Sequence, residues 1–358
     1  MTKSILATIL FLFSVSSVVA QIEPPKLTPT PLTDSQRSVV REGVVLHDRG
    51  DYDGAIAKYE EVLRENPEND LALYEMAYSY QMKRDYRKSL ELAQKGARYK
   101  SDNLTGFYLL MGNNLDELGE PKKAIEVYKQ ALKLTPNTSL LYYNLAITYS
   151  RMNDLDETKK NLKKAVYLNP NHPSSHLLLA RVFQNTRYKT PALFAAMRFL
   201  VLEPRSQRSS TGYKIFSELM GAGVTQKSPT EINITLDTGG KKDEGDFDAI
   251  ELTLALTKAA GADEKEKHKS EVQLLVDQLN GQLAIVSEME AKGDKSKFTW
   301  RYYIPYFTEL KKRNHVEPFV YYISQSSQMP GVTEWLQANP ERVIEFLNWS
   351  KSYQWAKE

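Results

Sequence analysis

The chain has 358 residues, of which 26% are charged and 41% are hydrophobic, and this composition is typical of a folded protein rather than a largely disordered one. Its 47 basic and 45 acidic residues leave a formal net charge of +2, too small to favour nucleic acid or an anionic membrane surface as a partner. The absence of cysteine excludes a disulfide framework and a lipid-bearing thiol, so the chain must fold by packing alone.

The first twenty residues differ from everything after them. Lys3 supplies a positive charge, residues 5–19 are almost wholly apolar, and small residues precede a cleavage site after Ala20. This arrangement predicts a secretory signal peptide (residues 1–20) and a mature chain exported to the bacterial periplasm or the exterior. The competing interpretation is a membrane anchor, but the apolar run is shorter than the ~20 residues that a spanning helix needs, and the mature chain has no second candidate.

Residues 21–35 form a proline-rich segment. The prolines are Pro24, Pro25, Pro29 and Pro31. Their density predicts an extended, unpacked linker, because proline favours extended backbone and cannot donate a backbone hydrogen bond. Asp34 or Ser35 is expected to cap the helix that follows by accepting a hydrogen bond from a backbone amide.

A period of 34 residues organises the next part of the chain. Closing prolines at Pro67, Pro136, Pro170 and Pro204 are separated by 69, 34 and 34 residues. The five units are residues 36–69, 70–104, 105–138, 139–172 and 173–206, with one inserted residue between the second and the third. A repeat of this length predicts stacked helical hairpins, because one unit alone cannot bury its apolar face.

Small residues recur in phase within these units. The eighth position is occupied by Gly43, Ala77, Gly112, Ala146 and Ala180, as close helix crossing requires. The turn between the two helices contains Gly50 or Gly119, where glycine supplies left-handed backbone. The pattern, fullest in Gly43…Gly50-Asp51-Tyr52…Pro67 and Gly112…Gly119…Ala124-Ile125…Pro136, resembles the tetratricopeptide repeat family over residues 36–206. The resemblance implies an all-α, right-handed superhelix of helical hairpins whose concave face commonly binds peptides or helices of other proteins, and it seldom implies catalysis.

The repeat register indicates which side chains line the concave groove. First-helix positions 2, 5, 9 and 12 are expected to face inward, and the candidate partner-binding residues are Arg37, Val40, Val44, His47, Leu71, Tyr74, Tyr78, Gln81, Leu109, Asn113, Asp116, Leu140, Tyr143, Asn144, Ile147, Ser150, Leu177, Arg181 and Gln184. This lining favours an extended peptide or an amphipathic helix, with Tyr74, Tyr78, Asn113 and Tyr143 contributing most. Acidic terminal tails fit poorly, because Leu109 replaces the lysine of the family members that grip carboxylates. The alternative is that the C-terminal part of the chain covers some of these residues.

The repeat period ends after residue 206. Apolar residues at helical spacing predict a capping helix in residues 207–224, which is needed because the last repeat would otherwise expose its apolar face. Residues 225–358 are expected to form a mainly helical module, with room for one short strand in residues 230–240. Residues 247–260 alternate like a strand, but their length and alanines favour a helix, which Asp246 is expected to cap. Further helices are expected within 263–292 and 298–323, and at 332–338 and 340–352.

Three local patterns suggest chemistry but have simpler explanations. His172 and His176 have the spacing of a zinc-binding pair, but Pro173 interrupts it and no third ligand lies nearby, so no metal site is predicted. Residues 239–242 (Gly-Gly-Lys-Lys) lack the remaining features of a phosphate loop, which favours a surface turn. The aromatic residues of 298–323 could stack on glycans or anchor an interface, but their helical spacing favours core packing.

The sequence therefore predicts an exported scaffold that recognises another protein and uses no cofactor. The five histidines are scattered without a nucleophile motif, so no catalytic residue is named and the chain is not expected to be an enzyme. The alternative is that residues 225–358 form an enzyme or a carbohydrate-binding module that the repeats dock. A pocket lined by Trp300, Tyr303 and carboxylates would support this alternative, whereas a filled interior would remove it.

Overall fold

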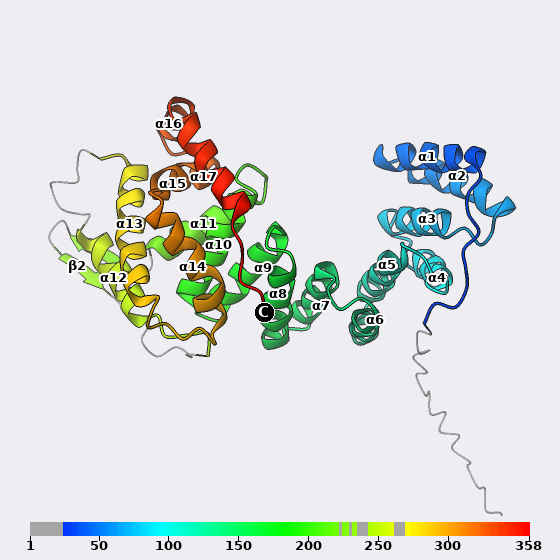
Figure 1. Ribbon diagram of the computed structural model, residues 1–358, viewed down its shortest axis with the longest axis horizontal. Helices are drawn as coiled ribbons and strands as arrows, with labels where there is room; N and C mark the ends of the chain where they lie inside the picture. Colours follow the sequence, from blue (N-terminus) through cyan, green and yellow to red (C-terminus); the bar gives the residue numbers. More distant parts are fainter. Residues whose placement is uncertain (1–23, 222–223, 229–230, 235–242, 261–268) are drawn as a thin grey trace, which may run out of the picture. The chain divides into compact units, whose positions relative to one another are not determined.

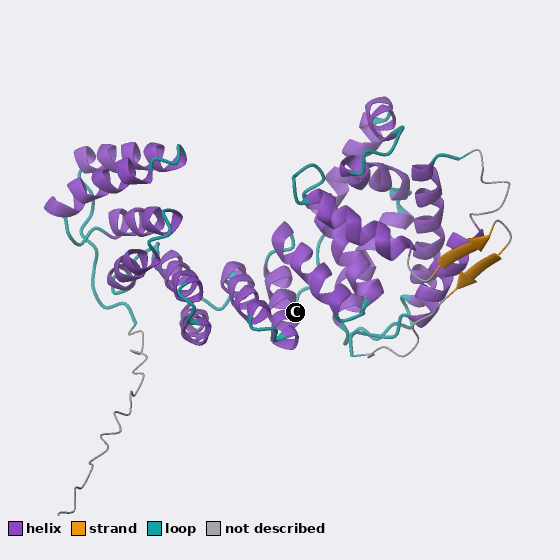
Figure 2. Cartoon of the chain, turned by 180° about the vertical axis from the view of Figure 1, so that it is seen from behind, coloured by secondary structure: helices purple, strands orange, loops and turns teal. Residues whose placement is uncertain are grey.

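The computed structural model describes residues 24–221, 224–228, 231–234, 243–260 and 269–358, which fold into helices and one two-stranded sheet (Figures 1 and 2). The predicted signal peptide lies outside the described residues. The chain divides into two compact units, residues 1–134 (unit 1) and 135–358 (unit 2). The sequence predicts a division near residue 206, whereas the structure groups the last two hairpins with the C-terminal helices. Within the described residues, no helix combines the length and hydrophobicity needed to cross a membrane.

Unit 1 consists of three helical hairpins, which confirms the predicted fold class for this part of the chain. They are α1 (Asp34–Asp48) with α2 (Tyr52–Glu65), α3 (Asp70–Met82) with α4 (Tyr86–Gly96), and α5 (Leu104–Glu117) with α6 (Pro121–Leu134). The second helix of a hairpin also packs on the first helix of the next one, α2 on α3 and α4 on α5 (Figure 1). The apolar face that one hairpin cannot bury alone is thereby covered by its neighbour.

Small residues in this stack make room for large aromatic side chains. A Cβ atom on Gly43 would lie 2.5 Å from the ring of Tyr59, and one on Gly112 would lie 2.3 Å from the ring of Tyr128. Both tyrosine side chains are buried, at 0% and 1% exposure. The small eighth position is therefore required by the aromatic residue on the second helix of the same hairpin.

The turn inside every hairpin contains one residue with left-handed backbone. Gly50 and Gly119 have φ angles of 82° and 79°, as the sequence predicts. Arg84, Asn153 and Arg187 occupy the same position in the other three hairpins, with φ angles of 66°, 60° and 64°. A left-handed conformation costs a residue other than glycine about 1 kcal/mol. The packing of the two helices therefore determines the turn geometry even where glycine is absent.

The proline-rich segment is extended, but the prediction that it is an unpacked linker is wrong. Leu27 pairs with Tyr99 in an isolated parallel β-bridge, and the amide of Lys100 donates to the carbonyl of Leu27 over 2.8 Å. The side-chain amide of Asn69 donates to the carbonyl of Thr30 over 2.9 Å. Prolines remove backbone donors but leave the carbonyls able to accept, and donors at the ends of the repeats use them.

The first helix is capped by Thr33 and not by Asp34 or Ser35. The Thr33 hydroxyl accepts from the amide of Gln36 over 3.3 Å, and the Gln36 side chain accepts from the amide of Thr33 over 3.2 Å. This reciprocal pair is a capping box, which satisfies two backbone donors at once. The sequence prediction missed it because it considered the residues inside the helix and not the glutamine three positions beyond the true cap.

Unit 2 contains two hairpins, a further helix and the C-terminal module. The first elements are α7 (Ser139–Arg151), α8 (Leu155–Leu168), α9 (Pro173–Asn185), α10 (Lys189–Leu202) and α11 (Ser209–Gly221). The module comprises β1 (Val224–Ser228), β2 (Glu231–Ile234), α12 (Asp248–Ala260), α13 (Glu271–Met289), α14 (Phe298–Lys312), α15 (Val316–Ile323), the 3₁₀ helix η2 (Ser324–Ser326), α16 (Val332–Ala338) and α17 (Pro340–Ser352). Helix α11 packs on α10, where the sequence predicts a capping helix.

Two details of the module differ from the expectation or refine it. The single predicted strand is an antiparallel hairpin, in which Val224 pairs with Ile234, and the remainder of the predicted strand, residues 235–240, lies outside the described residues. The ambiguous residues 247–260 form helix α12, and the Asp246 carboxylate accepts from the amide of Asp248 over 3.1 Å.

The core of unit 2 is centred on α10. Nearly all of its side chains are buried, because α9 and α11 cover one part of its surface and α14 and α15 another (Figure 1). Phe194 on α10 stacks on Phe307 on α14 with ring centroids 4.9 Å apart. The fifth hairpin and the C-terminal module therefore share one hydrophobic core, which explains why the two belong to the same compact unit.

Candidate functional site

In unit 1, a row of large side chains follows the first helices of the first two hairpins. His47 on α1 stacks on Tyr78 on α3 at 4.8 Å, and Tyr78 is stacked on Tyr74 at 6.4 Å. Tyr78 is 37% exposed, and Met82, one turn further along α3, is 44% exposed. Tyr74, Tyr78 and Met82 are four residues apart and so follow one face of the helix. We call His47, Tyr74, Tyr78 and Met82 the α3 row.

Contacts with Ser79 on α3 and Phe107 on α5 hold the α3 row in place. The Nδ1 atom of His47 and the Ser79 hydroxyl are joined by a 2.7 Å hydrogen bond, and the ring of Phe107 meets the ring of Tyr74 edge to face at 5.6 Å. A Cβ atom on Gly106 would lie 2.5 Å from the Tyr74 ring, so the absence of a side chain there lets the ring lie flat on α5. Burial lowers the pKa of His47 below its usual value, which favours the neutral imidazole at pH 7. The row is thus preorganised and uncharged.

Two polar residues predicted beside this row form side-chain hydrogen bonds, one to the next repeat and one within its own repeat. The amide of Gln81 donates to Asn114 Oδ1 over 2.9 Å, and the Tyr128 hydroxyl donates to Asn113 Oδ1 over 2.6 Å. These bonds fix the orientation of both amides. The other predicted residues of unit 1 also lie at the surface in part: Arg37 is exposed, and Val44, Leu71, Leu109 and Asp116 are half-buried.

Two predicted groove residues belong to the core instead. Val40 is only 4% exposed and Leu177 is only 8% exposed. Leu177 lies in the cluster that includes Phe183 and Phe216, because α11 covers this end of the repeats. The position number alone could not distinguish these residues from Tyr74, which occupies the same place in its unit but is larger and remains partly at the surface.

The remaining predicted residues lie in unit 2. Tyr143 meets the ring of His172 edge to face at 4.7 Å, and Gln184 donates to the Glu218 carboxylate over 3.0 Å. Leu140 is 45% exposed. Arg181 is also exposed, whereas Asn144, Ile147 and Ser150 are half-buried. These side chains form a more scattered surface than the α3 row, with no comparable line of stacked rings among the described residues.

The histidine pair that resembles a zinc motif is used for packing. His176 is fully buried, where the Tyr303 hydroxyl lies 2.7 Å from its Nδ1 atom and its Nε2 atom lies 3.0 Å from the carbonyl of Pro170. His172 is joined to the Ser175 hydroxyl over 2.7 Å. The Nε2–H of a neutral His176 donates to the carbonyl, and Nδ1 accepts from the tyrosine. Its Nδ1 atom therefore joins α9 to α14, and its Nε2 atom joins α9 to the segment that precedes it.

The aromatic residues of 298–323 lie in the core, as the sequence predicts. Trp300 and Tyr303 are 2% and 0% exposed, and Trp300 stacks on Phe247 at 5.4 Å. A sugar ring cannot stack on side chains that are covered in this way. The alternative of a glycan-binding surface built from Trp300 and Tyr303 is therefore wrong, because both side chains are packed in the hydrophobic core.

The sequence prediction missed one member of the α3 row and one pocket. Met82 falls outside the expected inward positions, although its spacing of four residues from Tyr78 places it on the same face of the helix. The pocket lies in unit 2 between α11, α13 and residues 327–330. No periodic pattern links these three segments, so the sequence contains no signal for it.

Two comparisons with known proteins agree with the repeat assignment. A family model described as TPR repeat matches residues 43–83 and 112–153, and a second one, described as tetratricopeptide repeat, matches residues 140–172. The chain is 28% identical over 127 residues to a TPR repeat-containing protein of Methanocaldococcus jannaschii. The aligned segment covers 36% of this chain and 22% of that protein. It is 38% identical over 80 residues to the human protein O-mannosyl-transferase TMTC3. This aligned segment covers 22% of this chain and 9% of that protein. The chain thus spans less than a quarter of the length of either relative.

A comparison with solved structures finds similar helical repeats. The crystal structure of a thermophilic TPR protein from Thermus thermophilus aligns with 52% of this chain and 98% of its own length, at 21% identity and a TM-score of 0.44. The matched residues contain α2, α3, α6, α7 and α8 in full and parts of α1 and α5, and α4 lies between the matched segments. This chain therefore contains tetratricopeptide repeats within residues 43–172.

Proposed function

We propose that unit 1 binds an extended or helical segment of a partner protein along the α3 row. The observation that carries this proposal is that stacked aromatic side chains remain exposed. Burying their apolar surface would stabilise the folded chain, so their exposure suggests that a partner covers them. Tyr78 and Met82 are 37% and 44% exposed although their ring and thioether are apolar. Tyrosine is enriched among the residues that dominate binding energy at protein interfaces, and methionine adapts its shape to different partners.

The spacing of the row suggests the form of the partner. Tyr74, Tyr78 and Met82 repeat every four residues, so they present apolar surface at intervals of about 6 Å along α3. A partner helix with apolar residues at positions i, i+4 and i+7, or an extended peptide with alternate apolar residues, can match this interval. Because His47 and Tyr78 are already stacked, little conformational entropy is lost when they are covered.

We expect Tyr78→Ala to weaken partner binding at least about tenfold, because truncation of a central aromatic anchor costs about 2 kcal/mol or more and about 1.4 kcal/mol is tenfold in Kd. A photo-crosslinking residue in place of Met82 identifies the bound segment in the native compartment. A labelled peptide of that segment is then titrated with the parent and variant chains, and binding is followed by fluorescence anisotropy.

Tyr86→Ala is the matched control, because Tyr86 is a half-buried tyrosine of the same hairpin that lies on its second helix. This control should leave binding unchanged. Equal affinities for the parent chain and Tyr78→Ala would contradict the proposal, as would an equal loss in the control. Far-UV circular dichroism distinguishes a loss of binding from a loss of fold.

We further propose that the chain is exported, on the evidence of Lys3, the apolar residues 5–19 and the small residues that end at Ala20. Expression in a bacterial host should then give a periplasmic chain whose first residue, by mass spectrometry, is Gln21. Leu12→Arg interrupts the apolar run and should leave the full-length precursor in the cytoplasm, whereas Thr28→Arg lies beyond the cleavage site and should not. A parent chain that stays in the cytoplasm with residues 1–20 attached would contradict export.

A further inference from the structure

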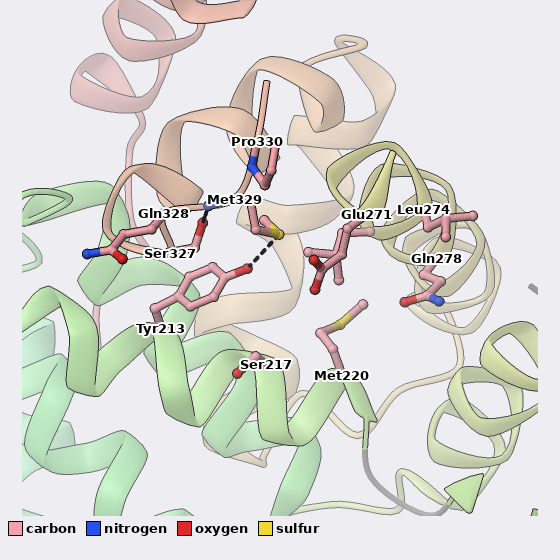
Figure 3. A pocket seen from close by; sticks show the side chains of 11 residues that line it. Tyr213, Ser217, Met220, Glu271, Leu274, Gln278, Ser327, Gln328, Met329 and Pro330 are labelled. Atoms are coloured by element: carbon pink, nitrogen blue, oxygen red, sulfur yellow. Dashed lines mark hydrogen bonds between the residues drawn. The ribbon is translucent and has the colours of Figure 1, made fainter. Parts of the chain in front are cut away.

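A pocket in unit 2 combines one carboxylate with flexible apolar walls. Its volume is about 490 Å³, within the range of small-molecule sites. Three segments line it (Figure 3): Tyr213, Ser217 and Met220 of α11, then Glu271, Leu274, Leu275 and Gln278 of α13, and then Ser327, Gln328, Met329 and Pro330 of the loop after η2. These segments are far apart in the sequence, so the pocket is a product of tertiary packing.

The charge of the pocket comes from Glu271. No lysine, arginine or histidine lines the pocket, and Glu271 forms no ion pair with any residue that the structure describes. The lysines on neighbouring segments have other carboxylate partners: Lys214 pairs with Glu218 at 3.8 Å and Lys269 with Asp277 at 2.7 Å. The pocket therefore presents a negative charge that lacks a counter-ion among the described residues.

The other side chains are suited to an amphiphilic ligand. Figure 3 shows the carboxylate of Glu271 directed into the pocket, with the side chains of Met220 and Met329 on either side of it. The Tyr213 hydroxyl is directed at the sulfur of Met329 at 3.6 Å, and a thioether is a weak acceptor that a better one can replace. The two methionines, with Leu274, provide adaptable apolar surface for a short hydrocarbon chain.

The loop after η2, which lines one side of the pocket, contains a strained backbone conformation and is preceded by an unsatisfied hydroxyl. Gln328 has a φ angle of 58°, a left-handed conformation that is unfavourable for a residue other than glycine. Within the described part of the chain, the hydroxyl of Ser326 is buried and has no hydrogen-bond partner. Strained backbone and unsatisfied polar groups occur at ligand sites, although the repeat hairpins show that left-handed backbone also serves structural turns. Both observations, independent of the charge of Glu271, lie in the wall of the same pocket or directly before it.

We propose that this pocket binds a primary ammonium or guanidinium group carried on an aliphatic chain. The cation pairs with Glu271, and the chain lies between Met220 and Met329. A free amine and a lysine or arginine side chain of another polypeptide share this chemistry, and the site makes the same charged contact to both. The proposal concerns a site in unit 2 and does not depend on the α3 row of unit 1.

The test compares probes of similar length and different charge by isothermal titration calorimetry. Cadaverine and N-acetyl-lysine-N-methylamide represent the free amine and the lysine side chain, and each should bind with a Kd on the order of 1 mM, as its size allows. Valerate and 1-pentanol should bind at least about tenfold more weakly. Valerate is an anion and is repelled by the carboxylate of Glu271, and 1-pentanol is uncharged and forms no ion pair with it. The tighter of the two amines identifies the source of the ligand.

Variants of single carboxylates assign the site. Glu271→Gln should weaken cadaverine binding at least about tenfold, whereas Glu218→Gln, on α11 but outside the lining, should leave it unchanged. Glu271 is exposed, so the variant is expected to fold, which tryptophan fluorescence verifies because all four tryptophans lie in unit 2. Equal binding of cadaverine and valerate, unchanged binding to Glu271→Gln, or no heat with either amine at concentrations up to about 20 mM would overturn the proposal.

Discussion

Arg198→Ala is expected to lower the free energy of unfolding of unit 2 by about 4 kcal/mol, which is the range for truncating a large, fully buried side chain. Arg198 on α10 is 1% exposed. Its guanidinium donates to the Ser350 hydroxyl over 3.1 Å and to Asn171 Oδ1 over 2.8 Å, and it lies 4.8 Å from the centre of the Trp355 ring. Truncation would create a cavity between the fifth hairpin and the C-terminal segment and remove these contacts together.

The same position offers a control that separates packing from charge. Arg198→Met keeps most of the apolar stem and should cost about half as much, because replacing a buried charge by an apolar residue of similar shape is often well tolerated. Unfolding in urea, followed by tryptophan fluorescence, reports on this part of the chain because all four tryptophans lie in unit 2. A loss below about 1 kcal/mol for Arg198→Ala would show that this residue does not connect the two parts of the core.

Acidification is expected to destabilise unit 2 through His176. Burial and, to a lesser extent, the neighbouring Arg198 lower the pKa of His176 to about 3, whereas an unfolded chain has a histidine pKa near 6.5. Below pH 6.5 the unfolded state therefore binds the proton and the folded state does not. The stabilisation is complete above pH 6.5 and is lost as the pH falls, by about 1.4 kcal/mol per pH unit, until the folded-state pKa is reached.

His176→Gln isolates this contribution. Glutamine can donate to the carbonyl of Pro170 and accept from Tyr303, but it does not titrate. The variant should be less stable than the parent at pH 7, and the difference should shrink by about 1.4 kcal/mol per pH unit between pH 6 and pH 4, because the other histidines are present in both chains. Urea unfolding at each pH measures the two curves. Parallel curves would mean that His176 is protonated in the folded state or is not buried.

The repeat architecture was legible in the sequence because its determinants are local and recur. The hairpin turn, the small crossing position and the apolar stripe of a helix all lie within one 34-residue unit. A pattern that is unclear in one unit can therefore be recognised from the other units. Helices α16 and α17 coincide with the predicted residues 332–338 and 340–352 for the same reason, since apolar periodicity and a proline at Pro340 define them locally.

The register of the groove was predictable only in part. Tyr74 and Tyr78 lie at the surface of α3 as their positions predict, whereas Val40 and Leu177, at equivalent positions, are buried. Which side of a repeat remains open depends on the elements that pack against it, and those elements lie elsewhere in the chain. The attachment of the proline-rich segment at Leu27 was missed for this reason as well, since its partner Tyr99 lies two hairpins later.

By itself, the sequence determined the helical repeats that the family models match and the positions of most helices, and it predicted a set of amino acids that could face a partner. Only the tertiary structure decided that the fifth hairpin shares a core with the C-terminal module, that Arg198 and His176 connect the two, and that Glu271 faces a pocket. The physical reason is the range of the interactions. Helix propensity, turns and apolar periodicity act over a few residues, whereas burial and charge pairing join side chains that are far apart in the sequence, and no local pattern records which ones meet.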